Sequence, residues 1–219
     1  MSMKKTTAEK FSRSGKGRRP PPGSGKKKKS GLTRRGFLGS TAAGGVVVAS
    51  KSEAQSRTRV LGPQKAAITL NVNGQDRKLS VEPRVTLLRA LRNELDLTGT
   101  KEVCDRGSCG ACSVHLDGQL VTSCMVLAVD AIGKKVTTIE GLSDGDHLHP
   151  IQQAFLDHDA LQCGFCTPGM VMACKALLDK EKQPTLTQIK RSLGGNICRC
   201  GTYTNIFAAV QTAAKNMQG

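Results

Sequence analysis

The chain has 219 residues, with no tryptophan, one tyrosine and nine cysteines, and its formal net charge is +16. Such a charge is typical of nucleic-acid-binding proteins, but residues 1–65 carry 17 basic and 2 acidic side chains, whereas residues 66–219 carry 16 basic and 15 acidic ones. The folded part is therefore almost neutral, which argues against a DNA or RNA partner, and its length allows one or two compact domains.

The N-terminal segment has the composition of an export signal. Residues 1–31 are mostly Lys, Arg, Gly, Ser and Pro, with too few apolar side chains to fold. The stretch LTRRGFLGSTAAGGVVVAS at 32–50 resembles a twin-arginine signal built on Arg34 and Arg35, and its uncharged run is too short to anchor the chain in a bilayer. The alternatives are a disordered basic tail and a nuclear-type basic run.

We expect residues 1–54 to be a disordered basic region followed by this signal peptide. The small-x-small sequence Ser52–Glu53–Ala54 permits cleavage before Gln55, and no second apolar segment follows it. The sequence therefore predicts a periplasmic protein that is exported folded and has no stable membrane insertion after the signal is removed.

Residues 66–143 predict a small α+β domain. Apolar and polar residues alternate on both sides of Asn73–Gly74 and again on both sides of Asp117–Gly118, so each pair marks the turn of a β-hairpin. Between the hairpins, residues 85–95 place leucines at helical spacing. A last strand is expected at residues 134–142.

Residues 149–217 predict four helices, which suit a small bundle, after a linker at 143–150. The expected helices cover residues 149–159, 167–182, 185–193 and 204–217. Thr167 is the expected N-cap of the second helix, with Pro168 at its first position. Thr185 and Gln188 predict a capping box at the start of the third helix.

Eight of the nine cysteines fall into two quartets. The first quartet has the spacing C-x4-C-x2-C-x11-C and consists of Cys104, Cys109, Cys112 and Cys124. Its C-x4-C-x2-C core is the spacing of plant-type 2Fe–2S proteins. Gly107 and Gly110 allow the loop to adopt positive φ angles and to bring backbone N–H groups close to cluster sulfur.

The second quartet has the spacing C-x2-C-x31-C-x-C and consists of Cys163, Cys166, Cys198 and Cys200. Each of its two pairs comes just before a predicted helix, where the helix dipole favours a thiolate over a thiol. Two such turns facing each other would form a four-thiolate site at one end of the bundle.

Zinc and disulfides are the alternatives for these thiols. C-x2-C pairs bind structural zinc, and an exported protein often contains disulfides, but C-x4-C-x2-C is not a usual zinc spacing. Cysteines gathered on glycine turns favour ligands over disulfides. An exported zinc or disulfide module that recruits a partner, and a free-standing ferredoxin, stay open as alternative functions.

The remaining candidate residues have ordinary structural roles. Cys174 shares an apolar helical face with Met170, Ala173 and Leu177, so it is expected to be a core thiol. The four histidines are expected at surface or interface positions rather than as ligands: His115, His147, His149 and His158.

Three motifs carry a resemblance to a known family. They are CDRGSCGACSV at 104–114, LQCGFCTPGM at 161–170 and GNICRCGTY at 195–203. Together they closely resemble the iron–sulfur subunit of the molybdenum hydroxylases, the xanthine dehydrogenase and aldehyde oxidoreductase family. The resemblance runs from about residue 67 to 215, and with the twin-arginine leader the chain looks most like the small subunit of periplasmic aldehyde oxidoreductases.

The resemblance implies an N-terminal ferredoxin-like β-grasp domain followed by a C-terminal four-helix bundle domain. It implies that the first quartet ligates a distal 2Fe–2S cluster and the second a proximal one. It also implies that Gln162 and Cys200 hydrogen-bond the molybdopterin of a large partner subunit.

The implied chain is an electron-transfer subunit without a catalytic residue of its own. Electrons from aldehyde oxidation at molybdenum would pass through the proximal and then the distal cluster to FAD on a third subunit or to a cytochrome. An N-heterocycle dehydrogenase of the xanthine, isoquinoline or nicotinate type is the alternative complex.

Overall fold

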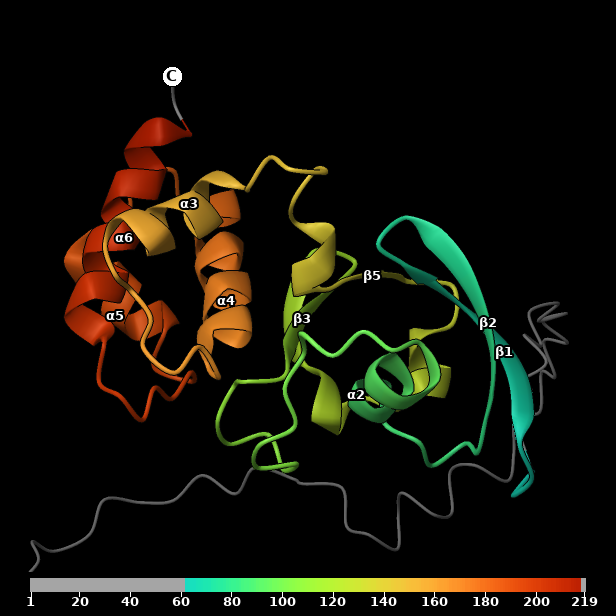
Figure 1. Ribbon diagram of the computed structural model, residues 1–219. Helices are drawn as coiled ribbons and strands as arrows, with labels where there is room; N and C mark the ends of the chain where they lie inside the picture. Colours follow the sequence, from blue (N-terminus) through green and yellow to red (C-terminus); the bar gives the residue numbers. More distant parts are fainter. Residues whose placement is uncertain (1–61, 218–219) are drawn as a thin grey trace, which may run out of the picture. The chain divides into compact units, whose positions relative to one another are not determined.

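The computed structural model describes residues 62–217. The predicted segment 1–54, with its arginine pair and cleavage site, lies outside the described residues. The described residues form a mixed α/β structure in which a sheet with its covering helix is followed by a set of helices (Figure 1). They all belong to one compact unit, residues 57–219.

The sheet has five strands in the order β2-β1-β5-β3-β4. The strands are β1 (Ala66–Val72), β2 (Gln75–Val81), β3 (Ser113–Leu116), β4 (Gln119–Thr122) and β5 (Lys135–Thr137). Both predicted hairpins are confirmed, since β1 pairs with β2 and β3 with β4 in antiparallel register, whereas β5 runs parallel to β1. Asn73 and Gly74 have φ angles of 52° and 79°, as a two-residue hairpin turn with left-handed backbone requires.

The last strand is shorter than the predicted range 134–142. The N–H of Thr138 donates to the Asn73 side chain instead of to a neighbouring strand, and the Asn73 amide donates back to the Thr138 hydroxyl. This side-chain exchange ends the ladder after Thr137, and the chain continues as the 3₁₀ turn η4 (Ile139–Gly141).

The helix predicted at 85–95 covers one face of the sheet. It consists of α2 (Leu87–Arg89), which continues as the π-helical η1 (Ala90–Glu94), and Thr86 caps its N-terminus. Leu87 and Leu91 are fully buried against the strand residues Leu70 and Val114, which gives this part of the chain its own apolar core. Two 3₁₀ turns, η2 (Ser123–Met125) and η3 (Ala128–Ala131), follow β4.

Four helices lie in the C-terminal part, close to the predicted ranges. They are α3 (Pro150–Asp157), α4 (Thr167–Lys180), α5 (Leu186–Ser192) and α6 (Tyr203–Asn216). The predicted capping box at Thr185 and Gln188 is confirmed. The predicted N-cap at Thr167 is wrong by one residue, because the backbone of Cys166 is already helical and takes the cap position.

The helices enclose a second apolar core. Phe155, Met170, Ile206 and Val210 are almost completely buried in it. Cys174 belongs to the same core, as predicted, and burial raises the pKa of its thiol. No helix in residues 62–217 combines the length and apolar character that crossing a membrane requires.

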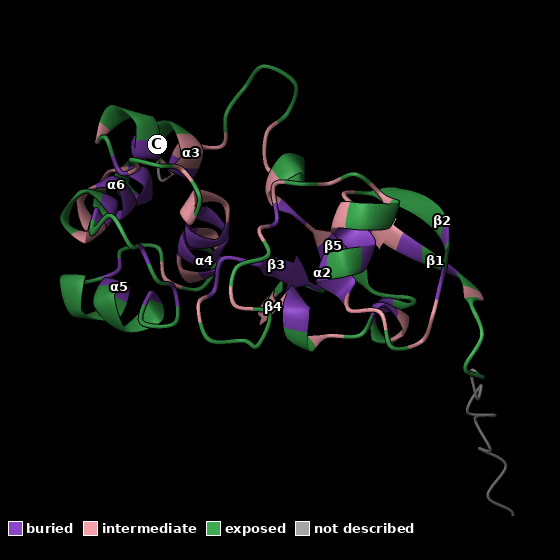
Figure 2. Cartoon of the chain, turned by 60° about the horizontal axis from the view of Figure 1, so that its bottom comes forward, coloured by how far each residue is buried: buried purple, intermediate pink, exposed green. Residues whose placement is uncertain are grey.

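Helix α4 joins the two cores because it lies against strands β3 and β4. Figure 2 shows buried residues on both β3 and α4. His115 on β3 is buried in this contact, and its Nε2 lies 2.9 Å from the Met172 carbonyl of α4, so the neutral ring donates there. His115 is thus an internal interface residue and not a surface one.

Candidate functional site

The first quartet gathers around the loop that leads into β3. Cys104, Cys109 and Cys112 come from this loop, and Cys124 comes from η2, directly after β4. Cys112 and Cys124 are buried, whereas Cys104 and Cys109 are half-buried. The hairpin β3–β4 therefore brings the fourth cysteine back beside the first three.

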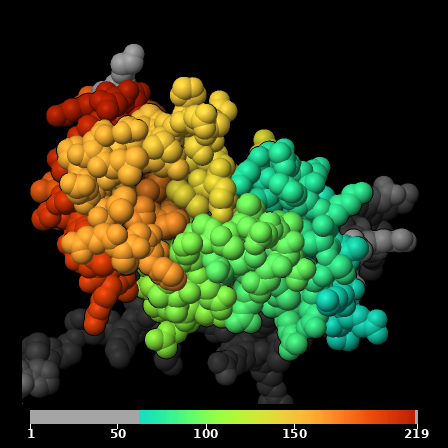
Figure 3. All heavy atoms as spheres, viewed as in Figure 1, coloured from blue at the N-terminus to red at the C-terminus, as the bar shows by residue number. Residues whose placement is uncertain are grey.

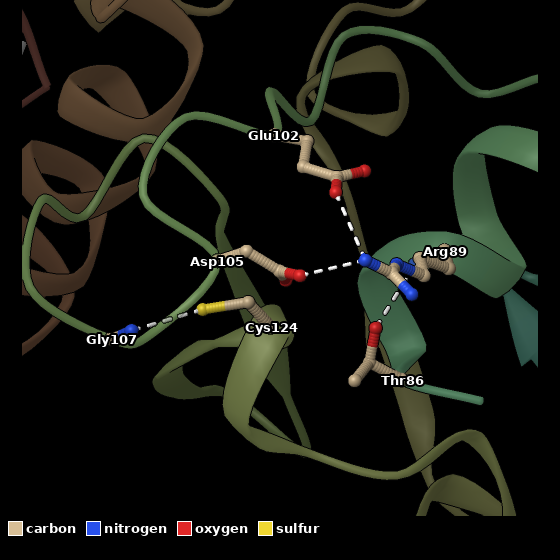
Figure 4. A network of polar contacts seen from close by, with 6 residues as sticks. All are labelled: Thr86, Arg89, Glu102, Asp105, Gly107 and Cys124. Carbon is tan, nitrogen blue, oxygen red and sulfur yellow. Dashed lines mark hydrogen bonds and ion pairs between the residues drawn. The ribbon is translucent and has the colours of Figure 1, made fainter. Parts of the chain in front are cut away.

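Backbone N–H groups of the loop point at two of these sulfurs. The Gly107 N–H donates to Cys124 Sγ at 3.2 Å (Figure 4). The Ser108 N–H donates to Cys104 Sγ at 3.3 Å. Gly107 has a φ of 73°, which a residue with a side chain adopts only under strain. The loop thus has the N–H···S contacts that stabilise negative charge on sulfur.

Arg89 on helix α2 forms ion pairs with the same loop. Its Nη2 lies 2.8 Å from an Asp105 carboxylate oxygen and 3.4 Å from one of Glu102 (Figure 4). Asp105 follows Cys104 directly, so the guanidinium fixes the start of the quartet. The sequence alone did not point to Arg89, because no local pattern relates a helix residue to an acid sixteen positions later.

The second quartet lies at the N-termini of two helices. Cys163 and Cys166 precede α4, and Cys198 and Cys200 precede α6, as the spacing predicted. Cys198 is buried and Cys166 half-buried, whereas Cys163 and Cys200 are exposed. The Sγ atoms of Cys163 and Cys200 are 3.5 Å apart.

The thiols of each quartet are close enough to act on one another. The Cys109 thiol lowers the pKa of Cys104, the Cys112 thiol raises that of Cys124, and the Cys198 thiol raises that of Cys166. All nine cysteines are free thiols. Among residues 62–217, no three His, Cys, Asp or Glu side chains converge as a single bound metal ion would require. Four thiols gathered in one part of the fold fit a binuclear iron cluster, in which two thiolates bind each iron.

The two quartets are directly connected through the backbone. The N–H of Ile197, the residue before Cys198, donates to the carbonyl of Cys109 at 2.9 Å. Figure 3 shows the green atoms of the first loop beside the orange atoms of the helical part. Gln162, the predicted molybdopterin contact, is exposed next to Cys163.

Comparisons with known proteins agree with this arrangement. Residues 70–136 match the model of a 2Fe–2S iron–sulfur cluster binding domain, and residues 138–211 match that of a [2Fe–2S] binding domain. The iron–sulfur-binding subunit PaoA of an aldehyde oxidoreductase from Escherichia coli O157:H7 is 43% identical over 203 residues, which cover 84% of this chain and 88% of PaoA. The chain belongs to the iron–sulfur small subunits of the molybdenum hydroxylases.

Other small subunits and solved structures are similar. A nicotinate dehydrogenase subunit from Pseudomonas putida is 46% identical over 151 residues, 69% of this chain and 96% of that protein. Quinoline 2-oxidoreductase from Pseudomonas putida 86 contains a chain with a TM-score of 0.69 and 40% identity, covering 71% of this small subunit and 97% of that chain. Aldehyde oxidoreductase from Desulfovibrio gigas gives a TM-score of 0.67 at 39% identity, over 70% of this chain and 17% of that one.

The thiols of this small subunit differ in acidity within the first quartet. The Arg106 backbone N–H, helped by the Cys109 thiol and opposed by burial, lowers the pKa of Cys104 to about 7. Burial and contact with the Cys112 thiol raise the pKa of Cys124 to about 12. In the metal-free chain Cys104 is therefore partly a thiolate at neutral pH, while Cys124 keeps its proton until metal displaces it.

The second quartet shows the same division. Burial acts to raise the pKa of Cys198, but hydrogen bonds from the Thr202 side chain and backbone outweigh it and lower the pKa to about 7. Burial and the neighbouring Cys198 thiol raise the pKa of Cys166 to about 12. The Phe165 backbone N–H and the Cys200 thiol also lower the pKa of Cys163. A metal bound at either quartet would therefore displace the protons of Cys124 and Cys166.

Proposed function

We propose that this chain is the electron-transfer subunit of a molybdenum-dependent hydroxylase that oxidises aldehydes, and that its two quartets ligate two 2Fe–2S clusters. The observation that carries the proposal is the presence of two quartets of free thiols on loops that hydrogen-bond to each other. The ligands are Cys104, Cys109, Cys112 and Cys124 for one cluster, and Cys163, Cys166, Cys198 and Cys200 for the other.

The chain's residues hold and shield the clusters. Each bound cluster supplies a centre that accepts and releases one electron at a time. The backbone N–H groups of Gly107 and Ser108 stabilise charge on the first set of sulfurs, and Thr202 does so at Cys198. Burial of Cys112 and Cys124 keeps water away from one side of the first cluster.

The second quartet faces the large molybdopterin-binding subunit in this proposal. Its exposed thiols, Cys163 and Cys200, lie among exposed apolar side chains, since Phe165 is 51% and Ile197 is 53% exposed. A partner that covered this surface would bury both. We infer that Gln162 and Cys200 contact the molybdopterin there, and that α3–α6 act as a four-helix bundle that presents the site.

The first quartet is then the exit towards FAD on a third subunit or towards a cytochrome. Aldehydes are the proposed substrate class because the match to PaoA covers 84% of this chain. The match therefore extends beyond residues 62–217, the part that the structure describes. An N-heterocycle dehydrogenase is the second candidate, favoured by the 46% identity to the nicotinate dehydrogenase subunit.

Metal analysis of the purified complex tests the cluster assignment. The proposal predicts about four iron atoms per small subunit, brown absorbance and a co-purifying molybdopterin subunit. A colourless chain that contains zinc or only disulfides would overturn it in favour of an exported binding module. A loaded chain that purifies alone would identify a free-standing ferredoxin.

Export through the twin-arginine route to the periplasm is proposed for the same chain. Replacing Arg34 and Arg35 by lysines should leave the precursor in the cytoplasm with its clusters. Unchanged delivery to the periplasm would refute the signal assignment.

A further inference from the structure

A single buried amide joins the two cluster-binding loops. Asn196 lies two residues before Cys198 and is 6% exposed. Its Nδ2 donates to the carbonyl of Gly110 at 3.0 Å and to the carbonyl of Gly169 at 3.1 Å. Gly110 lies between Cys109 and Cys112, and Gly169 lies in the first turn of α4, after Cys166. One side chain therefore contacts segments that carry ligands of both quartets.

The contact depends on backbone that approaches without side chains. A Cβ atom on Gly110 would lie 2.6 Å from Asn196 Nδ2 and 2.7 Å from the Gly195 carbonyl oxygen. A Cβ atom on Gly169 would lie 2.2 Å from the Gly110 carbonyl oxygen. Neither glycine could therefore carry a side chain without a shift of the neighbouring backbone, and the Asn196 amide contacts both of their carbonyls.

The neighbours of Asn196 hold it in this position. The Tyr203 hydroxyl accepts from the Cys198 N–H at 2.8 Å and donates to the Asn196 carbonyl at 3.3 Å. On the other side, the Ile197 N–H donates to the Cys109 carbonyl. Asn196 is therefore fixed at its backbone and at its amide, and it is the residue before Ile197, whose N–H forms the backbone hydrogen bond between the two quartets.

We propose that Asn196 is a positioning residue that sets the placement of the two clusters relative to each other, and thereby the rate at which an electron moves between them. The inference rests on the proposed function, since it requires both clusters. Electron exchange depends steeply on the separation and relative placement of the centres, so a small shift of one loop changes the exchange while each cluster keeps all its ligands.

Removing the amide should leave the chain folded. The Gly110 carbonyl also accepts from the Ser113 hydroxyl at 2.7 Å, and the Gly169 carbonyl lies within α4, where helix amides supply a donor. Neither carbonyl therefore becomes an unsatisfied buried group in an Asn196→Ala chain. Asn71→Ala is the control, since its amide donates to the Asp76 carboxylate within the hairpin β1–β2, which carries no cysteine.

The test uses the assembled complex, with EPR of the fully reduced clusters and rapid-freeze measurement of electron arrival at the first cluster. Asn196→Ala should keep the iron content and both cluster signals, weaken or alter the magnetic splitting between them, and slow arrival at the first cluster about tenfold or more, as small misplacements of reacting groups do. Asn71→Ala should match the wild type in every measurement.

Two results would overturn the proposal. Unchanged splitting and rate in Asn196→Ala would show that the amide does not set the placement. Loss of one cluster's iron would show that Asn196 is needed to form a site rather than to place it. Failure of the proposed function is distinguishable, because the wild-type complex itself would then lack two 2Fe–2S signals.

Discussion

The two cysteine quartets hold similar donors in different surroundings. The first lies within 21 residues, on a loop that forms an ion pair with Arg89 and continues into the hairpin β3–β4. Two of its four cysteines are buried. The second spans 38 residues, sits on two helix N-termini, and leaves Cys163 and Cys200 exposed. The chain itself encloses much of one site, whereas it leaves one side of the other for a partner to cover.

The largest expected difference between the two quartets is in cluster content after one ligand is removed. Cys200→Ser should lose the second cluster and lower the iron content from about four to about two atoms per chain, while the first cluster's EPR signal remains. Cys174→Ala is the control, because this core thiol belongs to neither quartet. Loss of both signals in Cys200→Ser would show that the two sites do not form independently.

A stability comparison of two glycines probes how tightly the first loop is enclosed. Gly110→Ala should lower the free energy of unfolding by about 3 kcal/mol, because it adds a clash with the Gly195 carbonyl to the strain of a φ of 69°. Gly107→Ala should cost only about 1–2 kcal/mol, since its Cβ would meet the flexible, exposed side chain of Met125. Urea denaturation measures both values, and equal losses would refute the proposed difference in enclosure.

Arg89→Gln should act on the first cluster alone. The two ion pairs are half-exposed, so the stability loss should be about 0.2–1 kcal/mol per pair and should shrink at high salt. Removing a cation beside the loop should lower the reduction potential of the first cluster and leave that of the second unchanged. Arg84→Gln, which removes an ion pair to Glu82 outside the loop, is the control for redox titration. A shift of both potentials would contradict the local role of Arg89.

The smallest expected effect is a pH dependence of the free energy of unfolding, which arises at the contact between β3 and α4. This contact connects the part of the chain with the first quartet to the part with the second. Burial lowers the pKa of His115 below its ordinary 6.5, so the unfolded chain binds this proton more readily than the folded one. Stability should therefore fall as the pH decreases from about 6.5 towards the lower folded pKa. His115→Gln should flatten this part of the curve, whereas His149→Gln should leave the contribution of His115 in place. If the stability of His115→Gln and of the wild type changed in parallel with pH, the buried His115 would not be the source of the pH dependence.

The sequence predicted the elements because their signals are local. The pairs Asn73–Gly74 and Asp117–Gly118 have the backbone preferences that a tight hairpin needs, and the cysteine spacings place thiols on loops and helix starts. Two predicted boundaries differ from the structure for local reasons. The hydrogen bond from Thr138 to the Asn73 side chain ends β5 early, and the helical backbone of Cys166 places the N-cap of α4 one residue earlier.

Contacts between distant residues could not be predicted in this way. Asn196 contacts a carbonyl 86 positions earlier in the chain, and its role depends on how the helical part meets the first loop. In the sequence, Asn196 is a single polar residue in the motif GNICRCGTY, and no local pattern distinguishes its side chain from an ordinary loop amide. His115 likewise appeared as an ordinary polar strand residue, because only the position of α4 buries it.

Quantitative EPR of the reduced wild-type protein tests whether each quartet holds a cluster of its own. Two distinct 2Fe–2S signals are expected, each integrating to about one spin per chain, with the second lost in Cys200→Ser. A single signal, or a spin count near one in total, would show that the two quartets do not each bind a cluster.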